Sequence, residues 1–429
     1  MADQHREYYR RLVDMAMMAG EIMMSVGAET RRVEDTITRI LMTSGFANAD
    51  AFVLRTGITI TLSDPRYKTI SITKRVYSGP PHLSKICDVN NVSREFCAGN
   101  INIEQAERKL RGIKRGRLYS DRQLLFAHLL ATSGFAYVFG GGFLESLLAL
   151  FVGLLLGLNN VYLSKFIKKA FISDLLGAAI VAVSGVGISI LVESLFNVSV
   201  GCQYIIVGSL MPLVPGTAFT GAIRDTVAGD YVSGIARMIE ALIIATSVAL
   251  GVAFGLFVTG LCGSSLDVEF TLAGIHSFGN HAIFAVLFTF WAIWGFCKVF
   301  SCPKKFYVIC CVVSAFCWAI YLLAIYCGFS SVWGTFFGAF FVDIMAQILA
   351  RKMKGPVTLF FVIGALPLVP GYGIYKVAYD MFSGGNVGAS LTNALLIAGA
   401  VALAVLVADT LIDMIIRAIA YIKEKKNPA

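Results

Sequence analysis

The chain has 429 residues, of which 57% are hydrophobic and only 15% charged, and its formal net charge is +9. Soluble domains carry roughly 25% charged residues, so this composition excludes an ordinary soluble protein and indicates a membrane protein. The charge is uneven, because 19 of the 36 Lys and Arg residues lie in residues 1–118. We therefore expect a polar N-terminal domain followed by a membrane-embedded body.

The first 118 residues predict a small α+β domain. Apolar residues recur at helical spacing over 6–26 and over about 29–44, on either side of the segment GAETRRVED (27–35). From Ala51 the period changes to two, as in hairpin strands, and a later helix opens at Asn102 with a capping-box pattern. No cleavable signal sequence opens the chain, so we expect this domain to lie in the cytoplasm.

The densest basic run of this domain, RKLRGIKRGR (108–117), could bind nucleic acid or mark the place where the chain enters the membrane. No aromatic residue is interleaved before Tyr119, which favours the membrane-entry interpretation. The ten cysteines show no metal-ligand spacing. We therefore predict no nucleic-acid partner, no metal and no other cofactor.

Ten apolar runs follow, each near the ~20 residues that a membrane-spanning helix needs. They cover about 122–141, 143–164, 171–195, 202–223, 234–262, 271–297, 306–327, 331–350, 356–379 and 388–416. If the N-terminal domain is cytoplasmic, alternate loops should be basic. Those loops do hold basic residues such as Lys165, Arg351 and Lys352, and the opposite loops hold only Lys376. The pattern predicts a multi-pass plasma-membrane protein with both termini in the cytoplasm.

Two of these runs carry a similar proline motif, LMPLVPG at 210–216 and LPLVPG at 366–371. Proline removes a backbone donor and destabilises a helix by about 3 kcal/mol. Two such motifs therefore suggest that the helix breaks serve a function. The assigned spans make the motifs run in opposite directions, and their glycines are 155 residues apart (371 − 216). An inverted repeat with one broken helix in each half is typical of secondary transporters, whose substrate site lies near the midplane.

We therefore expect an α-helical membrane protein built as a 5+5 inverted repeat. Its predicted domains are a cytoplasmic α+β domain at 1–118 and two five-helix repeats at 119–264 and 265–429. The match between the repeats extends beyond the motif, because Asp225 and Asp380 each follow nine residues after the motif's glycine.

The segments GAETRRVED and VPGTAFTGAIRDTVAGDYVSGIARMIEAL (214–242), with LPLVPG in the second half, closely resemble the threonine/serine exporter family. The resemblance covers residues 8–262 and 275–420 and implies an exporter of threonine or serine, not an enzyme. Some family members are linked to dicarboxylates, so export of a dicarboxylate such as succinate is an alternative. A membrane sensor or an intramembrane enzyme is a weaker one, because no motif such as GxGD or HExxH lies in the spans.

The motifs and the resemblance together nominate residues for substrate binding or gating. They are Pro212, Pro215, Gly216, Arg224, Asp225, Asp230, Arg237, Glu240, Pro367, Pro370, Gly371 and Asp380. Arg237 and Glu240 lie three residues apart on one predicted helix, and we expect them to form an ion pair near Asp225 at the cytoplasmic mouth.

The most deeply placed ionisable residue is Asp343. Charged groups inside a membrane are costly, so Asp343 is either a partnered structural carboxylate or a proton carrier, and Asp409 could join it in a relay. A zwitterionic amino acid gains nothing net from the membrane potential, so export against a gradient needs a coupled ion. We predict proton-coupled antiport by alternating access, with a small-molecule substrate, protons and the lipid bilayer as partners. The oligomeric state stays open, a homo-oligomer included.

Overall fold

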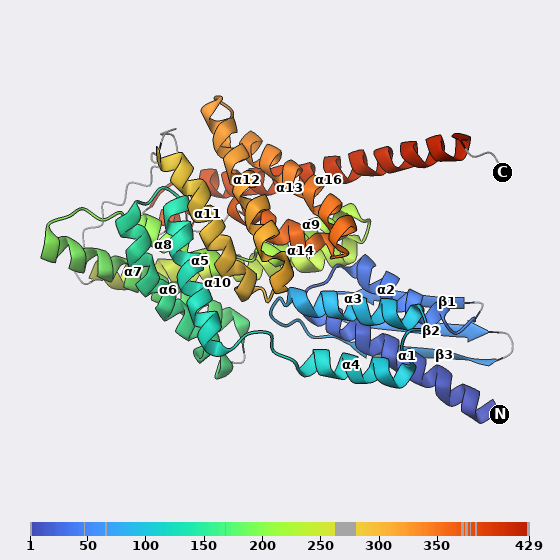
Figure 1. The fold of residues 1–429 in the computed structure, drawn as a ribbon. Coiled ribbons are helices and arrows are strands. Elements are labelled where there is room, and N and C mark those ends of the chain that lie inside the picture. The colour runs from blue at the N-terminus through green and yellow to red at the C-terminus, as the bar shows by residue number, and fades with distance from the viewer. Residues whose placement is uncertain are drawn as a thin grey trace. The chain divides into compact units, whose positions relative to one another are not determined.

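The computed structural model describes residues 2–46, 48–64, 67–167, 169–261, 280–369, 373, 376–377, 379–381 and 384–426. The chain divides into two compact units. Figure 1 colours the chain from blue at the N-terminus to red at the C-terminus. The first unit comprises Met1–Tyr119, Thr217–Glu240 and Phe300–Pro303. The second comprises Ser120–Gly216, Ala241–Val299 and Lys304–Ala429.

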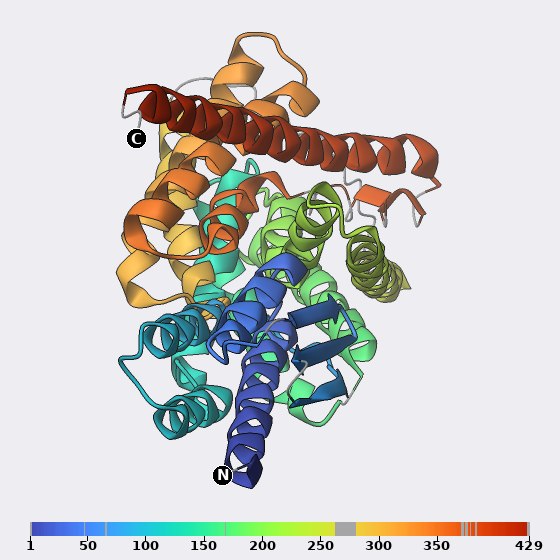
Figure 2. The ribbon, with the colours of Figure 1, turned by 90° about the vertical axis from the view of Figure 1, so that its right-hand side faces the viewer.

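The N-terminal part of the first unit is the expected small α+β domain. It contains, in chain order, α1 (Ala2–Ser25), α2 (Thr30–Met42), β1 (Asn48–Leu54), β2 (Gly57–Asp64), β3 (Tyr67–Arg75), α3 (Leu83–Cys97) and α4 (Ile103–Arg115). The strands form one antiparallel sheet in the order β1-β2-β3, which Figure 2 shows beside the N-terminal helices. The capping box at the start of α4 is confirmed, since Asn102 and Gln105 each accept a hydrogen bond from the other's amide.

Period-two alternation places one face of this sheet in the core. Ile58, Ile60 and Leu62 of β2 are fully buried, as expected for a half-buried strand. The opposite face carries hydroxyl groups, and Thr59 pairs with Thr73 across β2 and β3 at 3.1 Å. The sheet thus shields the N-terminal helices on one side and is polar on the other.

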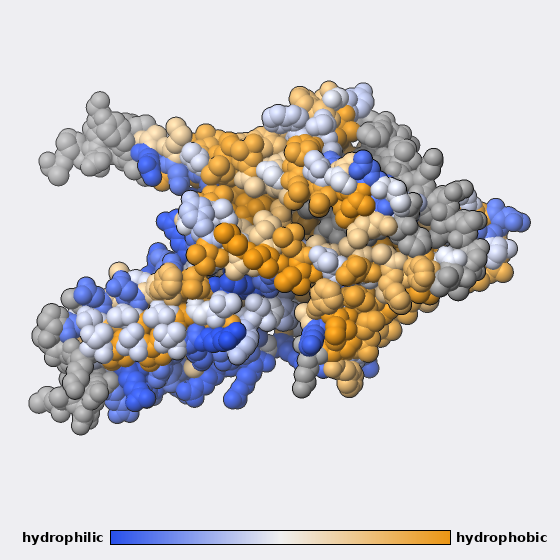
Figure 3. Space-filling view, turned by 180° about the vertical axis from the view of Figure 1, so that it is seen from behind, coloured by the Kyte–Doolittle hydropathy of each residue, from blue (hydrophilic) through white to orange (hydrophobic). Residues whose placement is uncertain are grey.

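The second unit and the segments attached to it are almost entirely helical. Its elements are α5 (Asp121–Val138), α6 (Phe143–Val161), η1 (Leu163–Lys165), α7 (Ala170–Phe196), α8 (Cys202–Leu210), η2 (Met211–Leu213), α11 (Asn280–Val299), η4 (Lys304–Phe306), α12 (Tyr307–Tyr326), α13 (Ser331–Met353), α14 (Val357–Gly364), η5 (Leu366–Leu368) and α16 (Val387–Lys426). Helices α9 (Gly216–Val227) and α10 (Tyr231–Leu261) begin in or beside the first unit and α10 continues into the second. In Figure 3 the surface of these helices is largely apolar, as expected for contact with lipid.

Small residues bring the helices of the second unit close together. A Cβ atom added to Gly134 of α5 would lie 2.6 Å from the Cβ of Ala292 in α11. One added to Gly295 of α11 would lie 2.6 Å from the carbonyl oxygen of Ala127. Membrane helices associate through such close backbone packing, because lipid provides no hydrophobic drive between them.

Ten membrane spans are not confirmed. Within the described residues, seven helices are long and apolar enough to cross a membrane, and one bent pair makes a possible eighth. The predicted span at 122–141 falls short because α5 opens with the polar residues Asp121, Arg122 and Gln123. The predicted span at 356–379 is represented by the short helix α14 and by η5, and part of it lies outside the described residues.

Candidate functional site: two proline breaks and a buried aspartate cluster

The first proline motif interrupts its helix as the sequence predicts. Helix α8 ends at Leu210, and Met211–Leu213 form a 3-10 turn with Pro212 near its start. Val214 is extended, with φ −65° and ψ 132°, because the ring of a following proline disfavours helical geometry. After Pro215 the chain resumes as α9 at Gly216, and the helices on either side of the break meet at 55°.

The second motif adopts the same local conformation. Helix α14 ends at Gly364, Leu366–Leu368 form a 3-10 turn that contains Pro367, and Val369 is extended with φ −63° and ψ 134°. Val369 and Val214 are 155 residues apart (369 − 214), so the sequence offset is also a structural one. Pro370 and Gly371 lie outside the described residues.

The two breaks contact each other. A Cβ atom added to Gly216 would lie 3.5 Å from Cγ2 of Val369 and 4.0 Å from Cδ1 of Leu366. Pro215, Gly216 and Pro367 are buried, and Pro212 is half-buried. Gly216 does not have a positive φ, so its contribution is the close approach to Val369 and not a left-handed backbone.

The turn after the first break ends α9 and starts α10. The amide of Asp230 donates to the carbonyl oxygen of Asp225 at 2.9 Å, and Gly229 between them has φ +90°. This is the usual glycine-assisted end of a helix. The carboxylate of Asp230 then accepts the amide of Ser233 at 3.1 Å and caps α10.

The turn after the second break repeats this pattern. The amide of Gly385 donates to the carbonyl oxygen of Asp380 at 2.9 Å, and Gly384 has φ +75°. The side chain of Asn386 accepts the amide of Ala389 at 3.0 Å and caps α16. Within the described residues, the two motifs are therefore alike at two places, the 3-10 turn of each break and the turn that follows it.

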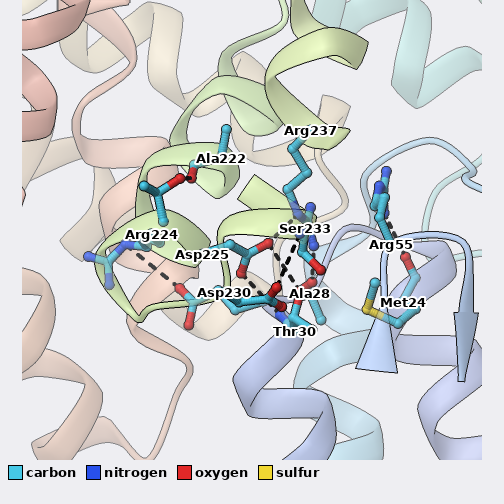
Figure 4. A network of polar contacts seen from close by, with 12 residues as sticks. Met24, Ala28, Thr30, Arg55, Ala222, Arg224, Asp225, Asp230, Ser233 and Arg237 are labelled. Atoms are coloured by element: carbon cyan, nitrogen blue, oxygen red, sulfur yellow. Dashed lines mark hydrogen bonds and ion pairs between the residues drawn. The ribbon is translucent and has the colours of Figure 1, made fainter. Parts of the chain in front are cut away.

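Asp225 lies at the centre of a buried polar cluster in the first unit (Figure 4). Asp225 and Arg237 are each only 1% exposed, and Nε of Arg237 donates to Oδ2 of Asp225 at 2.7 Å. The backbone amide of Thr30 donates to Oδ1 of Asp225, and its hydroxyl to Oδ2, both at 3.2 Å. Because Thr30 is the first residue of α2, the carboxylate occupies a helix N-terminus, where free amides and the helix dipole favour an anion. Arg237 also donates to the carbonyl oxygen of Ala28.

Two further ion pairs surround this cluster. Arg55, in the turn after β1, binds Glu240 through two hydrogen bonds of 3.0 and 3.1 Å. Burial, and next the positive charge of Arg237, lower the pKa of Arg55 from its ordinary value, although a guanidinium stays protonated in proteins. Nε of Arg224 lies 3.7 Å from Oε1 of Glu29.

The partners of these residues differ from the sequence prediction. Arg237 binds Asp225, whereas Glu240 binds Arg55 of the N-terminal domain instead of Arg237. Sequence reasoning missed Arg55 and Thr30, although GAETRRVED, the segment that contains Thr30, stood out in the sequence.

The other predicted site residues lie in the second unit. Asp380 is buried, 2.8 Å from Nζ of Lys376, and accepts a hydrogen bond from the hydroxyl of Ser390. Asp343 of α13 is fully buried, and Nε2 of Gln347 donates to it at 3.3 Å. The same amide nitrogen donates to Asp409 of α16, so Gln347 joins the two carboxylates. Among the described residues, no group of three or more His, Cys, Asp or Glu could hold a metal ion.

Long apolar helices around two interrupted segments define a multi-pass membrane protein of the kind that moves small molecules. The chain belongs to the threonine/serine exporter family, because a family model described as "Putative threonine/serine exporter" matches residues 14–259. A second model, "Threonine/Serine exporter, ThrE", matches residues 285–411.

Two curated relatives carry the same description. The "Probable threonine/serine exporter" of Mycobacterium tuberculosis is 19% identical over 408 residues, which cover 92% of this chain and 74% of that protein. The "Threonine/serine exporter" of Corynebacterium glutamicum is 22% identical over 382 residues, 86% of this chain and 75% of that protein. An uncharacterised protein of Schizosaccharomyces pombe is 24% identical over 260 residues, 58% of this chain and 30% of that protein. No solved structure matches the chain significantly.

Proposed function

We propose that the protein exports threonine and serine across the plasma membrane by alternating access between two inverted five-helix repeats. The observation that carries this proposal is the pair of proline breaks, which share one backbone conformation at an offset of 155 residues and contact each other at Gly216 and Val369. In transporters with broken helices, the freed backbone groups at such breaks bind the substrate. Family membership supplies the substrate class.

The proposed arrangement comprises a cytoplasmic domain at 1–118 and repeats at 119–264 and 265–429, with both termini in the cytoplasm. The asymmetric distribution of Lys and Arg among the loops supports this orientation. The repeats would reach ten spans if α5 and the segment beginning at α14 also cross the bilayer. Helix α5 has neighbours that favour this, because it packs against the apolar spans α6 and α11.

Proton coupling is the second part of the proposal. One charge that crosses about 150 mV supplies about 3.5 kcal/mol, enough for a substrate gradient of roughly 300-fold. Asp343 is the candidate carrier, because it is fully buried and Gln347 links it to a second carboxylate, Asp409.

We propose that the N-terminal domain restrains the turn between α9 and α10. We call the contacts of Thr30, Ala28 and Arg55 with Asp225, Arg237 and Glu240 the latch. Thr30 and Ala28 hold Asp225 and Arg237, and Arg55 holds Glu240. A movement of α9 against α10 therefore has to break buried charge-assisted bonds, which are among the stronger interactions in proteins. This gives the domain a direct means of controlling the transport cycle.

The comparisons give no support to export of dicarboxylates. That alternative required Arg224 and Arg237 to be available to an anionic substrate. Arg224 lies beside Glu29 and Arg237 binds Asp225, so both guanidinium groups already face protein carboxylates.

Uptake of labelled threonine, serine and succinate into inverted membrane vesicles tests the proposed function. We expect uptake of threonine and serine that rises several-fold when a proton gradient is imposed, and no uptake of succinate above vesicles without the protein. Uptake of succinate alone, or no gradient-dependent uptake of either amino acid, would contradict the proposal.

A further inference from the structure

A series of hydrogen-bonded polar side chains inside the first helices of the second unit ends on an acceptor that has no partner among the described residues. It begins at His128 of α5, whose Nδ1 lies 2.8 Å from the carbonyl oxygen of Leu124. A carbonyl oxygen can only accept, so Nδ1 carries a hydrogen. In the neutral ring Nε2 is then an acceptor, which matches the donor Nδ2 of Asn160 at 3.2 Å.

The direction of the remaining bonds follows from this start. Asn160 offers its Oδ1 to Nδ2 of Asn159 at 3.1 Å, and Nδ2 of Asn159 also donates to the carbonyl oxygen of Ser173 at 3.4 Å. Both partners of that nitrogen are acceptors, so the amide orientation of Asn159 is fixed. In this series of hydrogen bonds, Asn159 donates to Asn160, and Asn160 donates to His128. The acceptor atom left at the end of the series is Oδ1 of Asn159.

That last oxygen has no hydrogen-bond partner among the described residues. Asn159 is only 2% exposed. Buried polar atoms without partners are rare, and each one calls for an explanation such as a bound ligand or water. An unpaired acceptor at the end of a polarised chain attracts a donor more strongly than an isolated one.

Asn159 lies beside the first proline break. A Cβ atom added to Gly177 of α7 would lie 2.9 Å from Nδ2 of Asn159 and 3.4 Å from Cδ1 of Leu213, the last residue of the 3-10 turn. Helix α8, which leads into that turn, packs against α5, α6 and α7. Ser209, in the last turn of α8, also has a buried hydroxyl without a partner among the described residues.

We propose that Asn159 is a substrate-binding residue whose Oδ1 accepts a hydrogen bond from the ammonium or hydroxyl group of the exported amino acid at the first break. This inference rests on the proposed function. His128 and Asn160 are positioning residues, because they act only through the amide of Asn159. The amide of Asn159 is uncharged and would bind only the donor group of the zwitterion. The substrate carboxylate would bind elsewhere at the break.

The test is counterflow of labelled threonine in liposomes that contain the purified full-length protein. Asn159→Leu removes the acceptor at similar volume, and we expect it to raise the KM for threonine about ten-fold or more with a smaller change in kcat. Asn159→Asp keeps an acceptor oxygen at the Oδ1 position but turns its second oxygen toward the acceptors of Asn160 and Ser173. It should therefore lower stability, while the KM of the protein that accumulates stays within about three-fold of the parent value. If Asn159 acted only structurally, through Nδ2, Asp would be as harmful as Leu, and that result would overturn the inference.

A control variant separates substrate binding from general loss of a buried polar group. Ser189→Ala on α7 removes a buried hydroxyl that donates to the carbonyl oxygen of Gly185 in its own helix, and its KM should equal that of the parent. If Asn159→Leu does not accumulate, Asn159→Ala replaces it, because a smaller side chain cannot overpack the site.

Inhibition by 2-aminobutyrate, which lacks the hydroxyl of threonine, identifies the donor. If Asn159 binds the hydroxyl, Asn159→Leu loses the parent's preference for threonine; if it binds the ammonium, both ligands weaken equally. Equal KM in the parent and Asn159→Leu, with robust counterflow in both, would overturn this inference alone. Absence of threonine counterflow in the parent would instead refute the proposed function.

Discussion

The turns that follow the two proline breaks share a backbone hydrogen bond and a glycine with positive φ, but the partners of their aspartates differ. Asp225 and Asp380 each accept the amide five residues later. The carboxylate of Asp225 is held by Arg237 and by Thr30, 195 residues away in the N-terminal domain. The carboxylate of Asp380 is held by Lys376 and Ser390, both within ten residues of it.

The difference teaches which part of each motif is fixed by local physics and which part is free to change. Proline and glycine constrain the backbone wherever they stand, so both breaks keep their form. The partners of the aspartate are not constrained in this way. The first turn is held by the N-terminal domain, whereas the partners of Asp380 among the described residues are its own neighbours in sequence. We infer that the first turn is the regulated one.

The largest expected effect is at the contact between the breaks. Gly216→Val should lower transport at least about 100-fold while abundance stays near normal, because its methyl groups would displace Val369 and Leu366 at the proposed site. Gly216→Ala is the matched control, since its Cβ would lie 3.5 Å from Val369, an ordinary contact distance. Vesicle uptake measures both. Parental transport by the Val variant would make the breaks ordinary packing kinks.

The next effect distinguishes the two aspartates by stability. Arg237→Met leaves the buried charge of Asp225 uncompensated, and we expect a loss of about 3–5 kcal/mol. Lys376→Met should cost less than Arg237→Met, because Lys376 is 30% exposed and Ser390 still donates a hydrogen bond to Asp380. Thermal unfolding of the purified proteins measures both. The double variant Asp225→Leu/Arg237→Met should be less harmful than Arg237→Met alone, and strictly additive losses would show that the pair does not interact.

A smaller effect is expected for the bond between the N-terminal domain and Asp225. Thr30→Val is nearly isosteric and removes only the hydroxyl donor, so we expect a loss of about 1.5–3 kcal/mol for this bond to a charged group. Ser390→Ala is the corresponding change at Asp380. Hydrogen exchange at 225–230 should accelerate only in the first variant, and at 380–385 only in the second. Acceleration of both segments in either variant would mean that the two turns are not held separately.

The smallest predicted effect is a pH dependence of the latch. His82 caps α3, its amide donates to the carbonyl of Val26, and burial together with the charge of Lys85 lowers its pKa to about 4. The pKa of His82 in the unfolded chain is near 6.5. The folding stability of the domain is therefore at its full value above pH 6.5 and decreases as the pH falls toward 4, because only the unfolded state binds the proton. At pH 5.5 we expect the N-terminal domain to lose about 1 kcal/mol after allowance for partial exposure.

Hydrogen exchange, corrected for the intrinsic effect of pH, measures this change. At pH 5.5 it should accelerate at 26–30 and 225–230 and stay constant at 380–385. His82→Asn keeps a good helix cap but cannot titrate, so it should abolish the pH response. An unchanged response in that variant would assign the effect to another group.

Much of the fold could be predicted from the sequence, because the relevant signals are local. Helical and period-two spacing located the elements of the N-terminal domain, and proline at 212 and 367 located both breaks. The partners of the buried charges could not be predicted. Arg55 and Glu240 are 185 residues apart, and nothing in local sequence pairs them. The oxygen of Asn159, which has no partner among the described residues, becomes recognisable only from the packing of α5, α6 and α7. Helix α5 fails the hydropathy criterion for a span because its first residues are polar.

The orientation of the two turns tests the central claim of opposed repeats most directly. Ala228→Cys and Ala389→Cys place thiols at exposed positions beside the first and second turns. Intact cells would be treated with a membrane-impermeant maleimide, and the labelled peptides identified by mass spectrometry, with permeabilised cells as the control for reactivity. The account predicts that Cys at 389 is labelled in intact cells and Cys at 228 only after permeabilisation. Labelling of both positions from the same side would contradict it.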